Sequence, residues 1–176
     1  MKGKSIKEQI KEYFLKNPTA KLRVRQIERT LKVPLPSVIR YTKELTKEGV
    51  LKTSEVAGVI TYTADRGSEK FMLYKKLFNL EQLYLSGLVD CLKKELSNPG
   101  IIVFGSYSKA EDTESSDIDL YIETPSKKKI LLNQFEKKLE RNIQIFQHSS
   151  IKEIKNKELV NNIINGVTLN GFIEVL

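Results

Sequence analysis

Two short stretches of this sequence contain residue types that together can hold a metal-bound triphosphate. Gly105-Ser106 follows an apolar run over residues 101–104, and further along the chain Asp117 and Asp119 stand one residue apart. Side chains alternate between the two faces of a strand, so both carboxylates are expected on the same face. Mg²⁺ prefers oxygen ligands, and two neighbouring carboxylates can bind one ion or bridge two.

The Gly-Ser pair supplies the groups that an anionic phosphate needs. Gly105 lets the backbone approach a phosphate closely, and Ser106 can donate its hydroxyl and its backbone N–H. A helix beginning at this point would add a favourable dipole. Taken alone, Gly-Ser is usually a turn and Asp-x-Asp is usually a solvated strand edge. Together they predict a site that acts by positioning and charge neutralisation.

The segment 104–120 resembles the signature of the DNA polymerase beta-like nucleotidyltransferase superfamily, with the minimal nucleotidyltransferases as the most similar branch. The resemblance covers about residues 99–176. It implies that Gly105 and Ser106 contact the phosphates of a bound nucleoside triphosphate (NTP). Lys109 is a further candidate nucleotide-binding residue.

The same resemblance implies that Asp117 and Asp119 are the catalytic pair that binds Mg²⁺, with a third carboxylate on a later strand. That strand is expected at residues 142–146, where alternation places Gln144 at the third position. Glutamine offers a neutral oxygen to a metal but cannot act as a base. Whether the site catalyses transfer is therefore left open, whereas binding of a nucleotide and a metal ion is expected. Glu123, on the same strand face as the aspartates, is either a substitute acid or a solvated strand-end residue.

Charge is distributed unevenly along the 176 residues. The formal net charge is +8, and residues 1–66 contain 15 Lys and Arg against 7 Asp and Glu, whereas residues 67–176 contain 15 of each. The whole excess thus lies in the first third, which favours an anionic partner for that part of the chain. The alternative is a lysine-rich surface that serves only solubility.

The sequence of the first third predicts three helices followed by two strands. Ser5 with Glu8 forms a capping box before the first helix, helices are expected at residues 24–31 and from about Pro36, and two strands surround Ala57-Gly58. This order resembles a winged helix-turn-helix domain, whose third helix enters the DNA major groove. The candidate DNA-binding residues are Arg25, Ser37, Arg40, Tyr41, Lys43 and Lys47.

Arg40 is the best candidate for a contact to a base edge, and the lysines are expected to contact phosphates. Winged helices also serve as protein-binding modules, so a solvated basic face is the alternative. The salt dependence of binding to duplex DNA distinguishes a DNA-binding face from a basic face that is only solvated.

These observations predict an α+β protein with three parts: a winged helix-turn-helix domain at residues 1–66, a helical linker at 67–98, and a nucleotidyltransferase domain with a small mixed sheet at 99–176. The apolar spacing of the linker predicts one long helix or two short ones. This helical segment is expected either to pack into the core or to form the interface of a homodimer. Cys91, the only cysteine, is expected in the core, and His148, the only histidine, at the surface.

The expected function is binding of Mg²⁺-NTP beside double-stranded DNA, with transfer of a nucleoside monophosphate to an acceptor hydroxyl. One alternative is a catalytically inactive, nucleotide-sensing transcriptional regulator. Another, which the resemblance suggests, is an antitoxin-type transferase that acts on a helical toxin-like partner. No apolar run is long enough to span a bilayer, and no export signal is evident, so a cytoplasmic location without membrane contact is expected.

Overall fold

The boundary between the two units of the chain falls inside a single helix, α4 (Glu69–Leu85). The computed structural model describes residues 4–174. It separates into a first unit, Met1–Lys75, and a second unit, Lys76–Leu176. The boundary therefore lies within the segment 67–98 that the sequence predicts as a linker.

Three helices begin the first unit, in the predicted order: α1 (Ile6–Lys16), α2 (Val24–Leu31) and α3 (Leu35–Lys47). The predicted capping box is present, because Ser5 Oγ accepts from the Glu8 N–H at 3.3 Å while Glu8 Oε2 accepts from the Ser5 N–H at 2.9 Å. α3 packs against both α1 and α2. Fully buried apolar side chains from the three helices form the core: Ile10, Phe14, Ile27, Val38 and Leu45.

A β-hairpin completes the first unit. β1 (Leu51–Val56) pairs antiparallel with β2 (Val59–Ala64). Ala57 and Gly58 connect them with φ angles of 51° and 73°, and two positive φ values are what a tight two-residue hairpin loop requires. Three helices followed by a hairpin is thus the observed element order.

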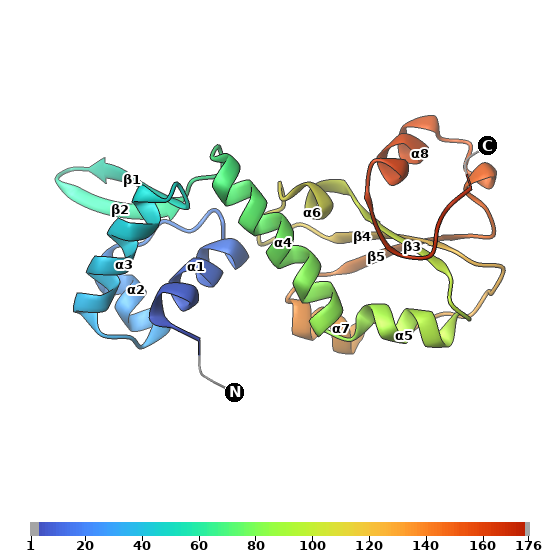
Figure 1. Cartoon of the computed structure of the whole chain (residues 1–176), viewed down its shortest axis with the longest axis horizontal. Helices are drawn as coiled ribbons and strands as arrows, with labels where there is room; N and C mark the ends of the chain where they lie inside the picture. The colour runs from blue at the N-terminus through green and yellow to red at the C-terminus, as the bar shows by residue number, and fades with distance from the viewer. Residues whose placement is uncertain (1–3, 175–176) are drawn as a thin grey trace. The chain divides into compact units, whose positions relative to one another are not determined.

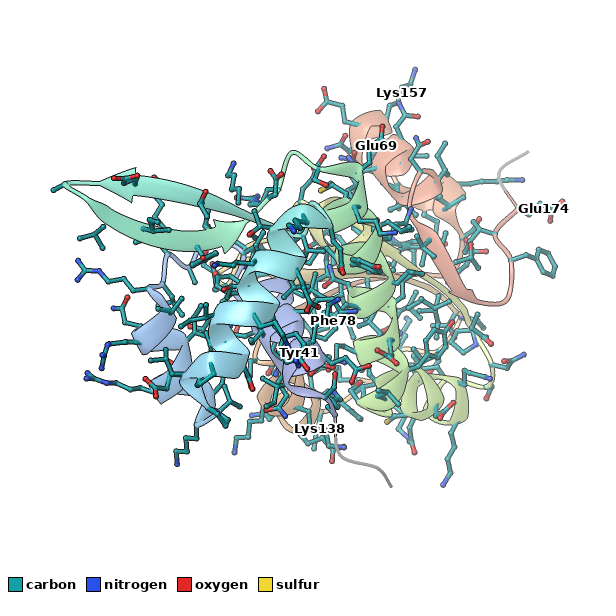
Figure 2. The ribbon with its side chains drawn as sticks, turned by 60° about the vertical axis from the view of Figure 1, so that its left-hand side comes forward. Tyr41, Glu69, Phe78, Lys138, Lys157 and Glu174 are labelled. Atoms are coloured by element: carbon teal, nitrogen blue, oxygen red, sulfur yellow. The ribbon has the colours of Figure 1, made fainter. Side chains whose placement is uncertain are left out.

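α4 ends where the chain turns into α5 (Leu88–Glu95), so this region forms two separate helices. Gly87 has a φ of 82°, and Ser86 Oγ accepts a hydrogen bond from the Leu88 N–H. Lys138, labelled in Figure 2, holds this turn by donating to the Ser86 carbonyl at 3.0 Å. Within residues 4–174, none of the helices is both long and apolar enough to cross a bilayer.

A mixed four-stranded sheet organises the second unit, in the order β5-β4-β3-β6. β3 (Gly100–Phe104) runs antiparallel to β4 (Ile118–Glu123) and to β6 (Val167–Asn170). β4 runs parallel to β5 (Ile143–His148). The predicted α+β class with a small mixed sheet is confirmed.

Helices cover both faces of this sheet (Figure 1). α5, α7 (Asn133–Leu139) and the end of α4 lie on one face, over a core that includes Leu83, Leu92, Val103, Leu120 and Phe135. α8 (Lys157–Ile164) and the 3₁₀ turn η1 (Ile151–Glu153) cover the other face, where Phe104 and Tyr121 are buried. α6 (Gly105–Lys109) follows β3 directly.

The sequence also predicts helices over residues 127–141 and 151–165, and both are shorter in the structure. The helix expected over 127–141 is only α7, because three lysines at 127–129 stand where the positive end of the helix dipole would repel them. The helix expected over 151–165 is interrupted. Asn156 Oδ1 accepts from the backbone N–H groups of Glu158 and Leu159, which caps α8 and separates it from η1.

Candidate active site

Gly105 and Asp119 lie against each other at the end of β3. In the antiparallel pair β3–β4, Phe104 is opposite Asp119, so the residue after Phe104 turns past the Asp119 carboxylate. A Cβ placed on Gly105 would stand 2.5 Å from Asp119 Oδ2, and Gly105 has a φ of 71°. The positive φ favours glycine here, and a Cβ at this position would have to displace the Asp119 carboxylate. The Gly-Ser turn and the second aspartate therefore form one local structure.

Asp119 also has Gln144 beside it on the other neighbouring strand. The parallel pair β4–β5 aligns Asp119 with Gln144. Residues aligned across a sheet project from the same face, so both side chains share the face on which Phe104 is buried. Gln144 is exposed, and its amide has no hydrogen-bond partner among residues 4–174.

Asp117 stands just before β4 and couples to Asp119 electrostatically. Burial raises the pKa of Asp119, and the charge of Asp117 raises it further. Asn142 Nδ2 donates to Asp117 Oδ1 at 3.1 Å, which orients this exposed carboxylate from the start of β5. Two carboxylates and two amide side chains thus meet at one end of β4.

α6 carries the other predicted nucleotide contacts. Ser106 is in its first turn, and the Ser106 hydroxyl has no hydrogen-bond partner among the described residues. Lys109, at the end of α6, is exposed and likewise has no ion-pair partner in residues 4–174. Both groups are therefore available to a ligand.

Glu123 does not join the aspartates. It lies four residues beyond Asp119 on β4, which is roughly 13 Å along a strand. Its Oε2 accepts from the Tyr121 hydroxyl at 2.9 Å and from the Ile151 N–H at 2.7 Å. The alternative third acid is thus wrong: Glu123 fixes η1 instead of approaching Asp119.

The Gly-Ser turn therefore ends a buried strand beside β4, which carries Asp119 and follows directly on Asp117. Residues 85–167 match the Nucleotidyltransferase domain family. The nucleotidyltransferase domain match runs from the last residue of α4 to the first residue of β6. No match was found among curated proteins or among solved structures.

Nucleotidyltransferase domains generally use Mg²⁺ and an NTP, and the donor set here suits one such ion. Asp117 and Asp119 supply carboxylate oxygens and Gln144 can supply an amide oxygen, all of them hard ligands. Within residues 4–174, no cluster of three or more His, Cys, Asp or Glu side chains is placed to hold a metal. Asp117 and Asp119 are therefore the two acidic side chains available to bind the ion.

Asn142 is a residue of this site that the sequence does not assign to it. Strand alternation over residues 142–146 predicts only that Asn142 shares a face with Gln144. The alternation was the available signal, but the contact to Asp117 depends on the parallel pairing of β4 with β5. Asn142 and Asp117 also line a pocket of about 370 Å³ that includes Ser116, Glu136 and Arg141.

The predicted DNA-binding residues lie in the first unit, on α2 and α3. Arg25 is exposed on α2, and Arg40, Lys43 and Lys47 are exposed on α3. Ser37 and Tyr41 (Figure 2), both half-buried, complete the set on α3. Arg40, Lys43 and Lys47 are spaced by three and four positions and so share a helix surface away from buried Val38, Thr42 and Leu45.

Arg40 is held by its neighbours on α3. Its guanidinium lies 4.3 Å from the centre of the Tyr41 ring and donates to the Tyr41 hydroxyl. It also approaches Glu44 at 3.9 Å. A DNA base contact would therefore have to replace these interactions.

Proposed function

We propose that the second unit binds a magnesium-bound NTP and transfers its nucleoside monophosphate to an acceptor hydroxyl. The observation that carries this proposal is the contact between Gly105 and Asp119, because it brings a phosphate-binding turn and a metal-binding carboxylate within one ligand's reach. The family match at residues 85–167 supports the same chemistry.

Each residue has a role that follows from its chemistry. Gly105 leaves room for a phosphate oxygen beside the backbone, and Ser106 donates its hydroxyl and N–H to the triphosphate. Lys109 offers a mobile positive charge. Asp117 and Asp119 hold the Mg²⁺, which when bound neutralises phosphate charge in the transition state.

The acceptor oxygen attacks the α-phosphorus of the NTP. The bond from that phosphorus to the bridging oxygen of the β-phosphate breaks, and pyrophosphate leaves. The proton of the acceptor hydroxyl must pass to a base, and Gln144 cannot take it because an amide is not basic. Transfer is therefore slow relative to binding, with solvent or a phosphate oxygen receiving the proton.

Gln144 also favours a second function for the same site, that of a nucleotide sensor without turnover. Two carboxylates are enough to hold Mg²⁺-NTP, and the exposed Gln144 amide can contact the bound ligand. In this reading the site reports the NTP concentration to the first unit.

For the first unit, we propose a winged helix-turn-helix domain that binds double-stranded DNA through α3. Its support is the order of three helices and a hairpin, the excess of positive charge, and the row of exposed basic side chains on α3. Lys43 and Lys47 contact phosphates and Arg40 reaches a base edge in the major groove. The resulting protein holds a nucleotide and DNA on one chain.

The deciding experiment compares the wild type with Asp117→Ala/Asp119→Ala. Binding of Mg²⁺-ATP and Mg²⁺-GTP is measured by calorimetry, and transfer is followed with NTP labelled at the α-phosphate. Asp90→Ala/Glu158→Ala is the matched control, since it removes the same charge from α5 and α8.

Labelled product with the wild type and the control, but not with the Asp117/Asp119 variant, establishes the transferase. Binding without product supports the sensor. Undiminished nucleotide binding by the Asp117/Asp119 variant overturns the site.

A further inference from the structure

A buried amide on α4 contacts both the helix that carries the Gly-Ser turn and the loop that leads to Asp117. Asn79 is 1% exposed. Its Nδ2 donates to the Tyr107 carbonyl at 2.9 Å and to Asp112 Oδ1 at 2.7 Å. The Tyr107 hydroxyl returns a bond to the Asn79 carbonyl at 3.3 Å.

The two acceptors, the Tyr107 carbonyl and the Asp112 carboxylate, lie on opposite sides of a turn in the chain. Tyr107 is in α6, two residues after Gly105. Asp112 is fully buried and follows Ala110, where the chain turns with a φ of 63°. One amide therefore fixes α6 on one side of that turn and the start of the loop to Asp117 on the other.

The amide can bond in only one orientation. Turning it over would place its oxygen against a carbonyl and a carboxylate, which are both acceptors. In the observed orientation, Asn79 Oδ1 is buried and has no hydrogen-bond partner among the described residues. An unsatisfied buried oxygen costs stability, and the two hydrogen bonds that the amide donates to buried acceptors offset that cost.

We propose that Asn79 is a positioning residue of the nucleotide site. It holds α6 and the loop to Asp117 at the separation that lets Gly105, Asp117 and Asp119 act on one ligand. Asn79 itself touches no ligand, and this inference rests on the proposed binding of Mg²⁺-NTP by the second unit.

The test is Asn79→Leu in the full-length chain, a change that keeps the branching and the number of heavy atoms of the side chain and removes both donated hydrogen bonds. Gln82→Leu is the matched control, because Gln82 is three residues further along α4 and its side chain has no hydrogen-bond partner within residues 4–174. Affinity for Mg²⁺-ATP and Mg²⁺-GTP is measured well below the unfolding temperature of every variant. Amide hydrogen exchange is measured in parallel.

Asn79→Leu should weaken nucleotide binding about tenfold or more, as the loss of a residue that orients a metal ligand commonly does. Hydrogen exchange should accelerate across residues 105–112 and stay unchanged in α8. Gln82→Leu should bind as the wild type does. A lower unfolding temperature with unchanged affinity would mean a merely structural role and would overturn the proposal.

If Asn79→Leu does not fold, an NMR measurement on the wild type still tests the proposal. The side-chain amide resonances of Asn79 should exchange slowly and shift when Mg²⁺-ATP saturates the protein, whereas an unshifted amide overturns the inference. A wild type that binds no nucleotide refutes the proposed function itself, and with it this role. Failure of the proposed function can be told apart from failure of the Asn79 role, because only the former shows as absent nucleotide binding in the unsubstituted protein.

Discussion

Gly105 lies so close to the carboxylate of Asp119 that a side chain on residue 105 would displace it. A Cβ on residue 105 would stand 2.5 Å from Asp119 Oδ2 and 3.4 Å from its Cγ. The turn at Gly105 and the Asp119 carboxylate are therefore sterically coupled.

The Gly105→Ala variant should lose nucleotide binding. The methyl group displaces the Asp119 carboxylate, and the left-handed backbone conformation costs an alanine about 1–2 kcal/mol. We expect affinity for Mg²⁺-ATP to fall about tenfold or more, measured by calorimetry. Gly87→Ala is the control: its φ is 82° and a Cβ there meets nothing within 4 Å. Equal losses in both variants would attribute the effect to backbone strain alone.

Replacing Gln144 by glutamate should increase transfer. Gln144 is aligned with Asp119 across β4 and β5, so a carboxylate at this position can take the acceptor proton. A positioned base commonly contributes about 100-fold or more, and we expect an increase of that order in the rate of labelled-product formation. Gln134→Glu, an exposed change of the same kind on α7, should have no effect. A rate that does not respond to Gln144→Glu would exclude residue 144 as the position of the missing base.

Nucleotide binding should depend on pH through Asp119. Burial and the Asp117 charge raise the pKa of Asp119, and a metal ion needs the ionised form. Binding should therefore weaken as pH falls through this raised pKa, at a higher pH than an ordinary aspartate would give. In the ligand-free protein, the folded state binds this proton more tightly than the unfolded chain. Stability should accordingly decrease as pH rises from the ordinary aspartate pKa through the raised one.

The Asp117→Asn variant isolates the second cause of that shift. Without the neighbouring charge, the pKa of Asp119 should move down but stay above its ordinary value, since burial remains. A ¹³C titration of the Asp119 carboxyl group in metal-free protein measures this directly. An unchanged titration midpoint would show that the two carboxylates are not coupled.

DNA binding should respond differently to two substitutions on α3. Lys43→Ala should weaken binding to all duplexes alike and reduce the dependence of log K on log salt by about 0.9, the contribution of one phosphate contact. Arg40→Ala should instead reduce discrimination between sequences. Fluorescence anisotropy over a salt series measures both, with Lys93→Ala on α5 as the control for loss of one charge. Absence of duplex binding at low salt would refute the DNA proposal.

Local signals in the sequence predicted the first unit well. Ser5 with Glu8, Ala57-Gly58 and the apolar spacing around Ile10 and Val38 each determine a backbone conformation within a few residues. The helix over 151–165 was wrong because its interruption depends on Glu123, distant in sequence, which accepts from the Ile151 N–H. Capping by Asn156 then begins a new helix.

The candidate site was predictable in composition but not in geometry. The types and spacing of Gly105, Asp117 and Asp119 indicated a metal-bound triphosphate. The contact of Asn142 with Asp117 depends on strand pairing, and the contact of Glu123 with the Ile151 N–H depends on the packing of η1; no local pattern specifies either. The expected homodimer and the helical toxin-like partner stay predictions.

The alignment of Gln144 with Asp119 has an evolutionary consequence. Codons for glutamine and glutamate differ at their first base alone, so a single mutation can exchange the amide for the acid. Because residue 144 is exposed, the exchange leaves the buried sheet contacts intact. Under the proposed function, one mutational step would thus separate a nucleotide receptor from a catalyst, without an unstable intermediate.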